Sequence, residues 1–323
     1  MTILVTGGIG FVGSHFVWAA HEAGRELVVL DDYSGGSAAP LPKGVLVIRG
    51  DVGDRALLGP LFKERRISAI AHFAGKIQVG ESVRAPDIYF DNNLVRGIAL
   101  LDAARNAGIE HILFSSSAAV YGTPERVPIA ETAPKAPLNP YGASKLSFEY
   151  VLSAYSHAFG LRFAALRYFN AAGAHVLGHL REAHEPETHL IPLVIDAALK
   201  IRPPLSVFGC DYPTEDGTCV RDYIHVQDLA SAHLAALSML ESGQNLGALN
   251  LGTGRGFSVK QVMDAAAQML GRDIPHVLGP RREGDAALLV ADPNRAMALL
   301  NWKCNRSDLN TLLEDTIRSR RPS

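Results

Sequence analysis

Hydrophobic residues in the first half of the chain follow two alternating patterns. Short apolar, β-branched runs bounded by turn residues predict buried strands, and the longer stretches between them carry apolar residues at helical spacing. The predicted strands are Ile3–Thr6, Glu26–Leu30, Leu46–Arg49, Ala69–Phe73, His111–Ser115 and Arg162–Tyr168. The predicted helices are Phe11–Ala23, Arg55–Arg65, Ile88–Ala107 and Pro140–Phe159. This alternation is typical of a doubly wound parallel sheet.

The alternation is lost after about Tyr168, where Gly, Pro and His become frequent. Further helices are predicted at Ile191–Ile201, Asp228–Glu241, Val259–Leu270 and Asp308–Ser319. We therefore expect an α/β protein in which residues 1–170 form a Rossmann-type domain with a doubly wound parallel sheet. Residues 171–323 should form a smaller mixed α/β domain over the carboxyl ends of that sheet. This boundary is soft, because the segment 220–242 can pack back on the first domain.

Composition narrows the class of protein. The chain has 323 residues, 47% of them hydrophobic, which is enough for a substantial core. The net charge of −2 argues against a nucleic-acid partner. No apolar stretch approaches the ~20 residues that span a bilayer, and the three cysteines lack a CxxC spacing. These features predict a cytoplasmic protein with no membrane partner.

A glycine-rich turn follows the first predicted strand. Glycines at 7, 10 and 13 allow a tight turn, close approach to a pyrophosphate, and packing of the next helix. Asp31 ends the second strand, where a carboxylate accepts hydrogen bonds from ribose hydroxyls and repels a 2′-phosphate. The pattern therefore predicts NAD, in preference to NADP, as the cofactor.

A second group of residues predicts proton transfer. Tyr141 and Lys145 are four residues apart near the start of a predicted helix, so they project from one face. A phenol is a weak base at neutral pH unless a neighbouring cation stabilises its phenolate. Ser117 follows the fifth strand, at the sheet edge where ligands bind in this architecture. We expect Tyr141 to act as the base, with Lys145 and Ser117 assisting.

The histidines after residue 178 raise the question of a metal site. His179, His184 and His189 alternate with glutamates 182, 185 and 187. Their five-residue spacing does not match one helical face, and Gly178 and Pro186 interrupt the segment. We expect a solvated loop at the rim of the substrate cleft and no metal.

Taken together, these motifs resemble the extended short-chain dehydrogenase/reductase family, and within it the UDP-glucose 4-epimerases. The resemblance covers nearly the whole chain. The segments that carry it are residues 72–75, 79–83, 91–93, 115–122, 167–174, 208–209, 211–218, 220–226 and 281–285. The stretch Asp-Tyr-Pro-Thr-Glu-Asp-Gly-Thr at 211–218 is much more specific than a glycine turn.

The resemblance implies an isomerase that inverts the C4 hydroxyl of a UDP-sugar with NAD that stays bound and is regenerated in each turnover. It places NAD against Gly7, Gly10, Phe11, Val12, Gly13, Asp31, Asp51, Val52, Phe73, Ala74, Asn92, Lys145 and Phe169. It places the UDP-sugar against Ser117, Tyr141, Asn170, His189, Phe208, Arg221, Arg282, Asp285 and Leu289. It also implies a homodimer in galactose metabolism, pairing the helices Ile88–Ala107 and Pro140–Phe159.

Three positions depart from the family pattern. Ile77 stands where many members have Lys, and His189 stands where Asn is common beside the diphosphate. Leu289 occupies the position that controls room for a 2-acetamido group, and its intermediate bulk leaves N-acetylated substrates open. A uronate epimerase and a related dehydratase or dehydrogenase also remain open. Ala118 and Ala119 disfavour the dehydratase, which needs an acid and a base after the fifth-strand hydroxyl.

Overall fold

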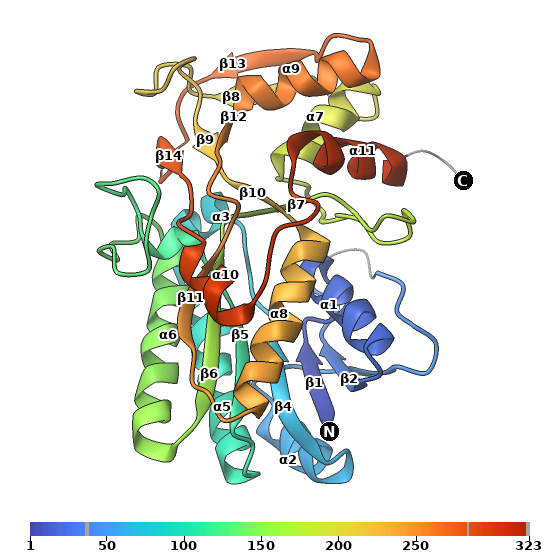
Figure 1. Ribbon diagram of the computed structural model, residues 1–323, viewed down its shortest axis with the longest axis vertical. Helices are drawn as coiled ribbons and strands as arrows, with labels where there is room; N and C mark the ends of the chain where they lie inside the picture. Colours follow the sequence, from blue (N-terminus) through green and yellow to red (C-terminus); the bar gives the residue numbers. More distant parts are fainter. Residues whose placement is uncertain (36–38, 283, 321–323) are drawn as a thin grey trace.

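A parallel sheet forms the centre of the lower half of Figure 1. The computed structural model describes residues 1–35, 39–282 and 284–320. Within these residues the sheet has seven strands in the order β11-β6-β5-β4-β1-β2-β3. They are β1 Thr2–Thr6, β2 Glu26–Asp31, β3 Leu46–Arg49, β4 Ile67–His72, β5 His111–Ser117, β6 Arg162–Tyr168 and β11 Gly247–Leu251. The order reverses between β1 and β4, where doubly wound sheets open a ligand crevice. The predicted α/β, Rossmann-type fold is confirmed.

Helices cover both faces of the sheet, which explains the uninterrupted apolar runs of the strands. Ile3 and Val5 of β1 point to the face covered by α1 and α8, and Leu4 points to the opposite face. All three side chains are fully buried. The helices are α1 Phe11–Glu22 and α8 Val226–Glu241 on the first face, and α2 Arg55–Glu64, α5 Arg96–Asn106 and α6 Pro140–Phe159 on the second.

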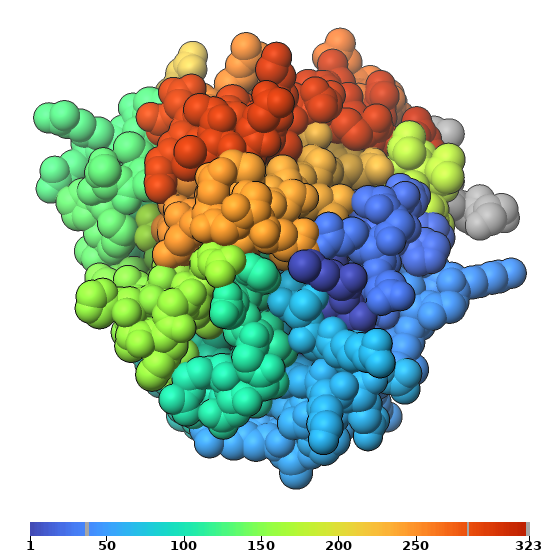
Figure 2. Space-filling model, turned by 60° about the horizontal axis from the view of Figure 1, so that its bottom comes forward, coloured from blue at the N-terminus to red at the C-terminus, as the bar shows by residue number. Residues whose placement is uncertain are grey.

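Helix α8 belongs to this lower layer, although it comes late in the sequence. Its residues Leu229 and Leu237 are fully buried in the same core as Phe16 of α1. Figure 2 shows the orange surface of this region between the blue N-terminal and red C-terminal parts. Strand β11 then adds to the edge of β6. A domain boundary at residue 170 would therefore separate α8 and β11 from the sheet against which they pack.

The helix predicted over Ile88–Ala107 is interrupted. The structure has α4 Pro86–Phe90, a π-helical turn Asp91–Val95 and then α5. A π-turn accommodates one extra residue per turn and changes where side chains point. It turns Asn93 inward, where its side chain bonds Lys76 and Ser144, while Asn92 lines the cleft described below.

The elements in the upper part of Figure 1 enclose an apolar core of their own, separate from the core of the sheet. Helix α9 begins with a capping box, in which Ser258 and Gln261 each bond the other's backbone N–H. The elements are α7 Leu190–Ala198, β8 Leu205–Phe208, α9 Val259–Leu270, β13 His276–Gly279 and α11 Leu309–Arg320. Strands β7 Asn170–Ala172, β9 Val220–Arg221, β10 Tyr223–His225, β12 Phe257–Ser258 and β14 Leu288–Leu289, with α3 Val79–Arg84 and α10 Asn294–Leu300, complete the fold. None of the described helices combines the length and apolarity needed to cross a membrane.

Two buried histidines in the lower layer predict acid sensitivity. Burial lowers the pKa of His72 to about 3 and that of His233 to about 4. Since an unfolded histidine titrates near ~6.5, the unfolded chain binds protons that the folded chain excludes. The stabilisation is complete above pH 6.5 and is lost as pH falls toward 3 to 4. At pH 5 each histidine should lower the free energy of unfolding by about 2 kcal/mol.

The measurement is denaturant unfolding of the wild type and His233→Gln at pH 7 and pH 5. The variant should lose about 2 kcal/mol less than the wild type between these pH values. His157→Gln, at an exposed position of α6, should behave like the wild type. Equal losses in His233→Gln and the wild type would contradict the assignment.

Candidate active site

Helix α6 carries two of the predicted catalytic side chains. Asn139 caps its start by accepting a hydrogen bond from Gly142 N at 2.9 Å, and Pro140 occupies the first turn. The helix ends at Gly160, which is left-handed. These boundary residues place Tyr141 and Lys145 one turn apart, directly after the cap, on the face toward β5.

Lys145 is buried and reaches the carboxyl end of β5. Its ammonium donates to Ser115 O at 2.9 Å and lies 5.9 Å from the centroid of the Tyr141 ring. Burial lowers the pKa of Lys145 to about 8. Burial also raises the pKa of Tyr141, although a hydrogen bond with Ser117 lowers it in part. A phenolate in this position therefore needs the ammonium close by and kept charged.

Two glycines of the turn after β1 leave no room for a side chain. Gly7 has a φ of +70°, and a Cβ there would lie 2.5 Å from Ala74 N. A Cβ at Gly13 would lie 2.2 Å from Gly7 O, so helix and turn are in close contact. Asp31 accepts from Ile9 N at 3.2 Å and Tyr33 N at 2.9 Å, which ties the end of β2 to this turn. The bare backbone beside a carboxylate fits the pyrophosphate and ribose of a dinucleotide.

One cleft of about 670 Å³ joins this turn to the upper part of the molecule. Of the residues predicted to contact cofactor, Gly7, Gly10, Phe11, Val12, Gly13, Asp31, Asp51, Val52, Phe73, Ala74, Asn92 and Phe169 line it. Of those predicted to contact substrate, Ser117, Tyr141, Asn170, His189, Phe208, Arg221, Arg282, Asp285 and Leu289 line it. Lys145 does not line the cleft. It lies behind the cleft wall, where its ammonium group donates a hydrogen bond to Ser115 O.

Two guanidinium groups lie at the upper end of the cleft. Arg282 stacks on the ring of Phe208 with 4.5 Å between its Cζ atom and the ring centroid. Arg221 is almost buried, and one of its terminal nitrogens lies 3.5 Å from Asp285 Oδ1. Forked guanidinium donors suit the oxygens of a diphosphate, and the half-exposed Phe208 offers an apolar surface to a base. Glu283 of the same motif lies outside the described residues.

Two positioning residues were missed in the sequence. The fully buried Asp222 accepts hydrogen bonds from Thr253 N at 2.9 Å, Thr253 Oγ1 at 2.7 Å and Ala291 N at 3.1 Å, which fixes the strand that carries Arg221. Asn93 joins the loop at Lys76 to α6 through Ser144. Both lie next to predicted contact residues, within the segments 91–93 and 220–226 that carry the family resemblance, and this is the sequence signal for them.

His189 lies on the cleft wall at the start of α7, but its surroundings differ from the expected solvated loop. The side chains of Glu182 and Glu187 are only 3% and 2% exposed. Burial lowers the pKa of His189, but the two glutamates more than offset this and bring it to about 9. The prediction of a solvated loop is wrong for Glu182 and Glu187, whose buried carboxylates accept backbone hydrogen bonds within the segment. The segment does line the cleft, as expected for a loop at its rim.

Comparison with known proteins agrees with this geometry. Residues 3–252 match the model of the NAD dependent epimerase/dehydratase family. The chain belongs to this family. As an epimerase/dehydratase family member it is an NAD-dependent enzyme, which confirms the predicted cofactor class.

Relatives of this epimerase/dehydratase chain align along its whole length. It is 45% identical to the UDP-glucose 4-epimerase of Lacticaseibacillus casei, over 97% of this chain and 95% of that one. The UDP-glucose 4-epimerase of Brucella ovis in complex with NAD has a TM-score of 0.93 and 42% identity, covering 98% of this chain and 97% of that one. The enzyme of Bifidobacterium longum in complex with NAD⁺ and UDP has a TM-score of 0.92 and 37% identity, covering 99% and 98%.

Proposed function

We propose that this enzyme interconverts UDP-glucose and UDP-galactose through a 4-keto sugar. The observation that carries the proposal is a single cleft that combines Tyr141 and Ser117, the glycine turn and two guanidinium groups. The relatives named as UDP-glucose 4-epimerases support the same reaction.

The chain's own residues hold the groups and move the proton. The turn at Gly7 to Gly13 and Asp31 hold the dinucleotide. A dinucleotide held there would supply a hydride acceptor and donor for C4 of the sugar. Tyr141 Oη, as phenolate, takes the proton of the 4-hydroxyl while the C4–H bond breaks, and C4 becomes a ketone. Lys145 keeps the phenolate accessible, and Ser117 bridges the sugar oxygen and Tyr141. Re-reduction returns the proton from Tyr141 to O4.

The UDP part of the substrate retains the ketone between these two steps. Arg221 and Arg282 would bind the diphosphate oxygens, and Phe208 would pack on uracil. Asp285 would accept hydrogen bonds from the ribose hydroxyls. Asn170 and His189 would line the same end. Because binding energy comes from UDP, the hexose is free to rotate and present its other face.

The alternative candidate function is an epimerase that also accepts N-acetylated sugars, and Leu289 is the residue that distinguishes it from the first. It lies on the cleft wall in β14 and packs with Phe169 against the core around Tyr121. Leu289→Ser should enlarge the cleft at this wall and raise kcat/KM for UDP-N-acetylgalactosamine by at least about 10–200-fold, the range for a single methylene in a hydrophobic pocket. Leu289→Tyr should lower it.

The test is incubation with UDP-galactose and, separately, UDP-N-acetylgalactosamine, with the products resolved by chromatography. UDP-galactose should yield UDP-glucose in the wild type and in both variants. An enzyme that holds NAD but converts no UDP-galactose would refute the proposed reaction. Equal UDP-N-acetylgalactosamine turnover in all three proteins would refute the role of Leu289 alone.

We also propose a cytoplasmic homodimer. Exposed apolar side chains on the helices named for the dimer support this, including Val95 at 57% and Tyr150 at 63% exposed. Pairing of these helices would cover them. All three cysteines are free thiols, which suits a reducing compartment.

A further inference from the structure

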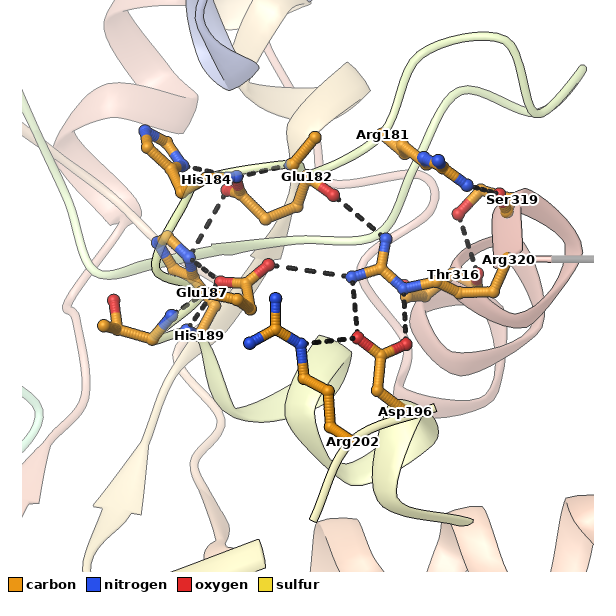
Figure 3. Close-up of polar contacts among 12 residues, drawn as sticks. Arg181, Glu182, His184, Glu187, His189, Asp196, Arg202, Thr316, Ser319 and Arg320 are labelled. Carbon is orange, nitrogen blue, oxygen red and sulfur yellow. Dashed lines mark hydrogen bonds and ion pairs between the residues drawn. The ribbon is translucent and has the colours of Figure 1, made fainter. Parts of the chain in front are cut away.

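Two turns of the same kind lie side by side in the loop between β7 and α7 (Figure 3). The first is Glu182-Ala183-His184 and the second is Glu187-Thr188-His189. In each turn, glutamate Oε1 accepts from the backbone N–H groups of the next two residues and pairs with the histidine Nδ1. Each turn thus holds a carboxylate and an imidazole together.

The second oxygen of each glutamate has no hydrogen-bond donor among the described residues. Glu182 Oε2 and Glu187 Oε2 are both buried, within side chains that are 3% and 2% exposed. Glu182 Oε2 lies 3.4 Å from His189 Nδ1, so the free oxygen of the first turn points into the second. A buried carboxylate oxygen without a donor is costly, and a cation in contact with it removes that cost.

The neighbouring arginines approach from the opposite side and leave this space open. Arg320 of α11 donates to Asp196 Oδ1 at 2.9 Å, and its terminal nitrogen lies 3.6 Å from Glu187 Oε2. Arg202 Nε lies 3.6 Å from Asp196 Oδ2. Figure 3 shows both guanidinium groups on the Asp196 side of the glutamates. Glu182 and the two imidazoles therefore face one another without an arginine between them.

We propose that Glu182, His184 and His189 bind one zinc ion. One donor atom from each of the three side chains lies within 4.8 Å of the others. Two donors ~2.1 Å from a tetrahedral ion are roughly 3.4 Å apart, close to the separation of Glu182 Oε2 and His189 Nδ1. Two imidazoles with a carboxylate suit Zn²⁺ or a similar late transition ion, whereas Mg²⁺ and Ca²⁺ prefer all-oxygen sites. The histidine side chains are 22% and 28% exposed, so an ion can enter from the cleft.

The ion would take the place of the hydrogen bonds between the imidazoles and the carboxylates. Binding therefore cross-links the two turns at the start of α7. Since both turns form part of the cleft wall, the ion would stiffen that wall and add positive charge to it. The inference rests on this side-chain cluster alone and does not depend on which sugar the enzyme uses.

The experiment is a metal titration of the full-length protein after treatment with a chelator. Zn²⁺ binding is followed by calorimetry, and Co²⁺ binding by the visible absorption of the tetrahedral ion. The wild type should bind one ion per chain and unfold at a higher temperature with zinc than without it. Glu182→Gln should weaken binding by at least the ~10–100-fold that follows loss of an outer-shell partner.

The matched control is His179→Gln. His179 lies in the same loop but packs against Trp18 in a tilted contact, with 4.6 Å between ring centroids, and is not a proposed ligand. Its stoichiometry and affinity should equal those of the wild type. If Glu182→Gln fails to fold by circular dichroism, His184→Gln carries the test, because its ring is partly exposed. A wild type that takes up no ion, or variants that bind as well as the wild type, would overturn the proposal.

Discussion

Tyr141→Phe should lower kcat by about 10²–10⁴-fold while changing KM little. The phenyl ring preserves the packing of α6 against the cleft but cannot take the proton from the sugar 4-hydroxyl. The hydroxyl's contribution arises as the C4–H bond breaks, so its loss affects the chemical step and not the binding of UDP. The measurement is a steady-state assay of UDP-galactose conversion with the variant and the wild type.

The control for this substitution is Tyr150→Phe. Tyr150 lies on the same helix but does not line the cleft, so loss of its hydroxyl should leave kcat unchanged. Bound dinucleotide, measured by absorbance after denaturation, should be equal in all three proteins. Near-normal turnover of Tyr141→Phe would remove the proposed base. A variant that loses its dinucleotide would point to a cofactor role.

Glu149→Leu should lower the free energy of unfolding by about 3–5 kcal/mol. Glu149 forms a two-point ion pair with Arg167, and both side chains are almost fully buried, at 7% and 3% exposed. Arg167 also donates to Tyr121 Oη at 2.8 Å. Removing the carboxylate leaves a guanidinium buried without its counter-charge, which costs more than the pair itself contributes. The measurement is denaturant unfolding with dinucleotide absent.

The double variant Glu149→Leu, Arg167→Leu separates this mechanism from simple loss of packing. It should recover part of the lost stability, because no unpaired charge remains. Glu110→Ala breaks the more exposed pair with Arg162 and should cost less than about 1 kcal/mol. If the double variant is as unstable as the sum of the two single changes, the buried charge is not the cause.

The parts of the fold that were predictable from sequence have local signals. Helix α6 was predicted to the residue, since Asn139, Pro140 and Gly160 mark its ends. Strand β11, Gly247–Leu251, was missed, because its sequence Gly-Ala-Leu-Asn-Leu lacks the β-branched residues that mark a strand. It is a strand because β6 offers a free edge. The π-turn at Asp91–Val95 was also missed, because its sequence Asp-Asn-Asn-Leu-Val contains no Gly or Pro that would interrupt the predicted helix.

The same distinction applies to the site. The glycine turn, Asp31 and the Tyr141–Lys145 pair lie within short motifs, so their types and spacing were enough to predict one cleft. The cluster of Glu182, His184 and His189 was not predictable by helical spacing, because its members meet through two turns of a loop. Such a contact depends on backbone hydrogen bonds that the side-chain pattern does not report.

The late position of α8 and β11 has a consequence for biosynthesis. While β1 to β6 are already outside the ribosome, the apolar face that α8 covers stays open until residue 241 has emerged. The free edge of β6 stays unpaired until Leu251 follows. The incomplete nascent chain therefore exposes an apolar sheet face and an unpaired strand edge. Both features promote aggregation. Slow translation of residues 170–250 would prolong this exposed stage and increase the nascent chain's need for chaperones.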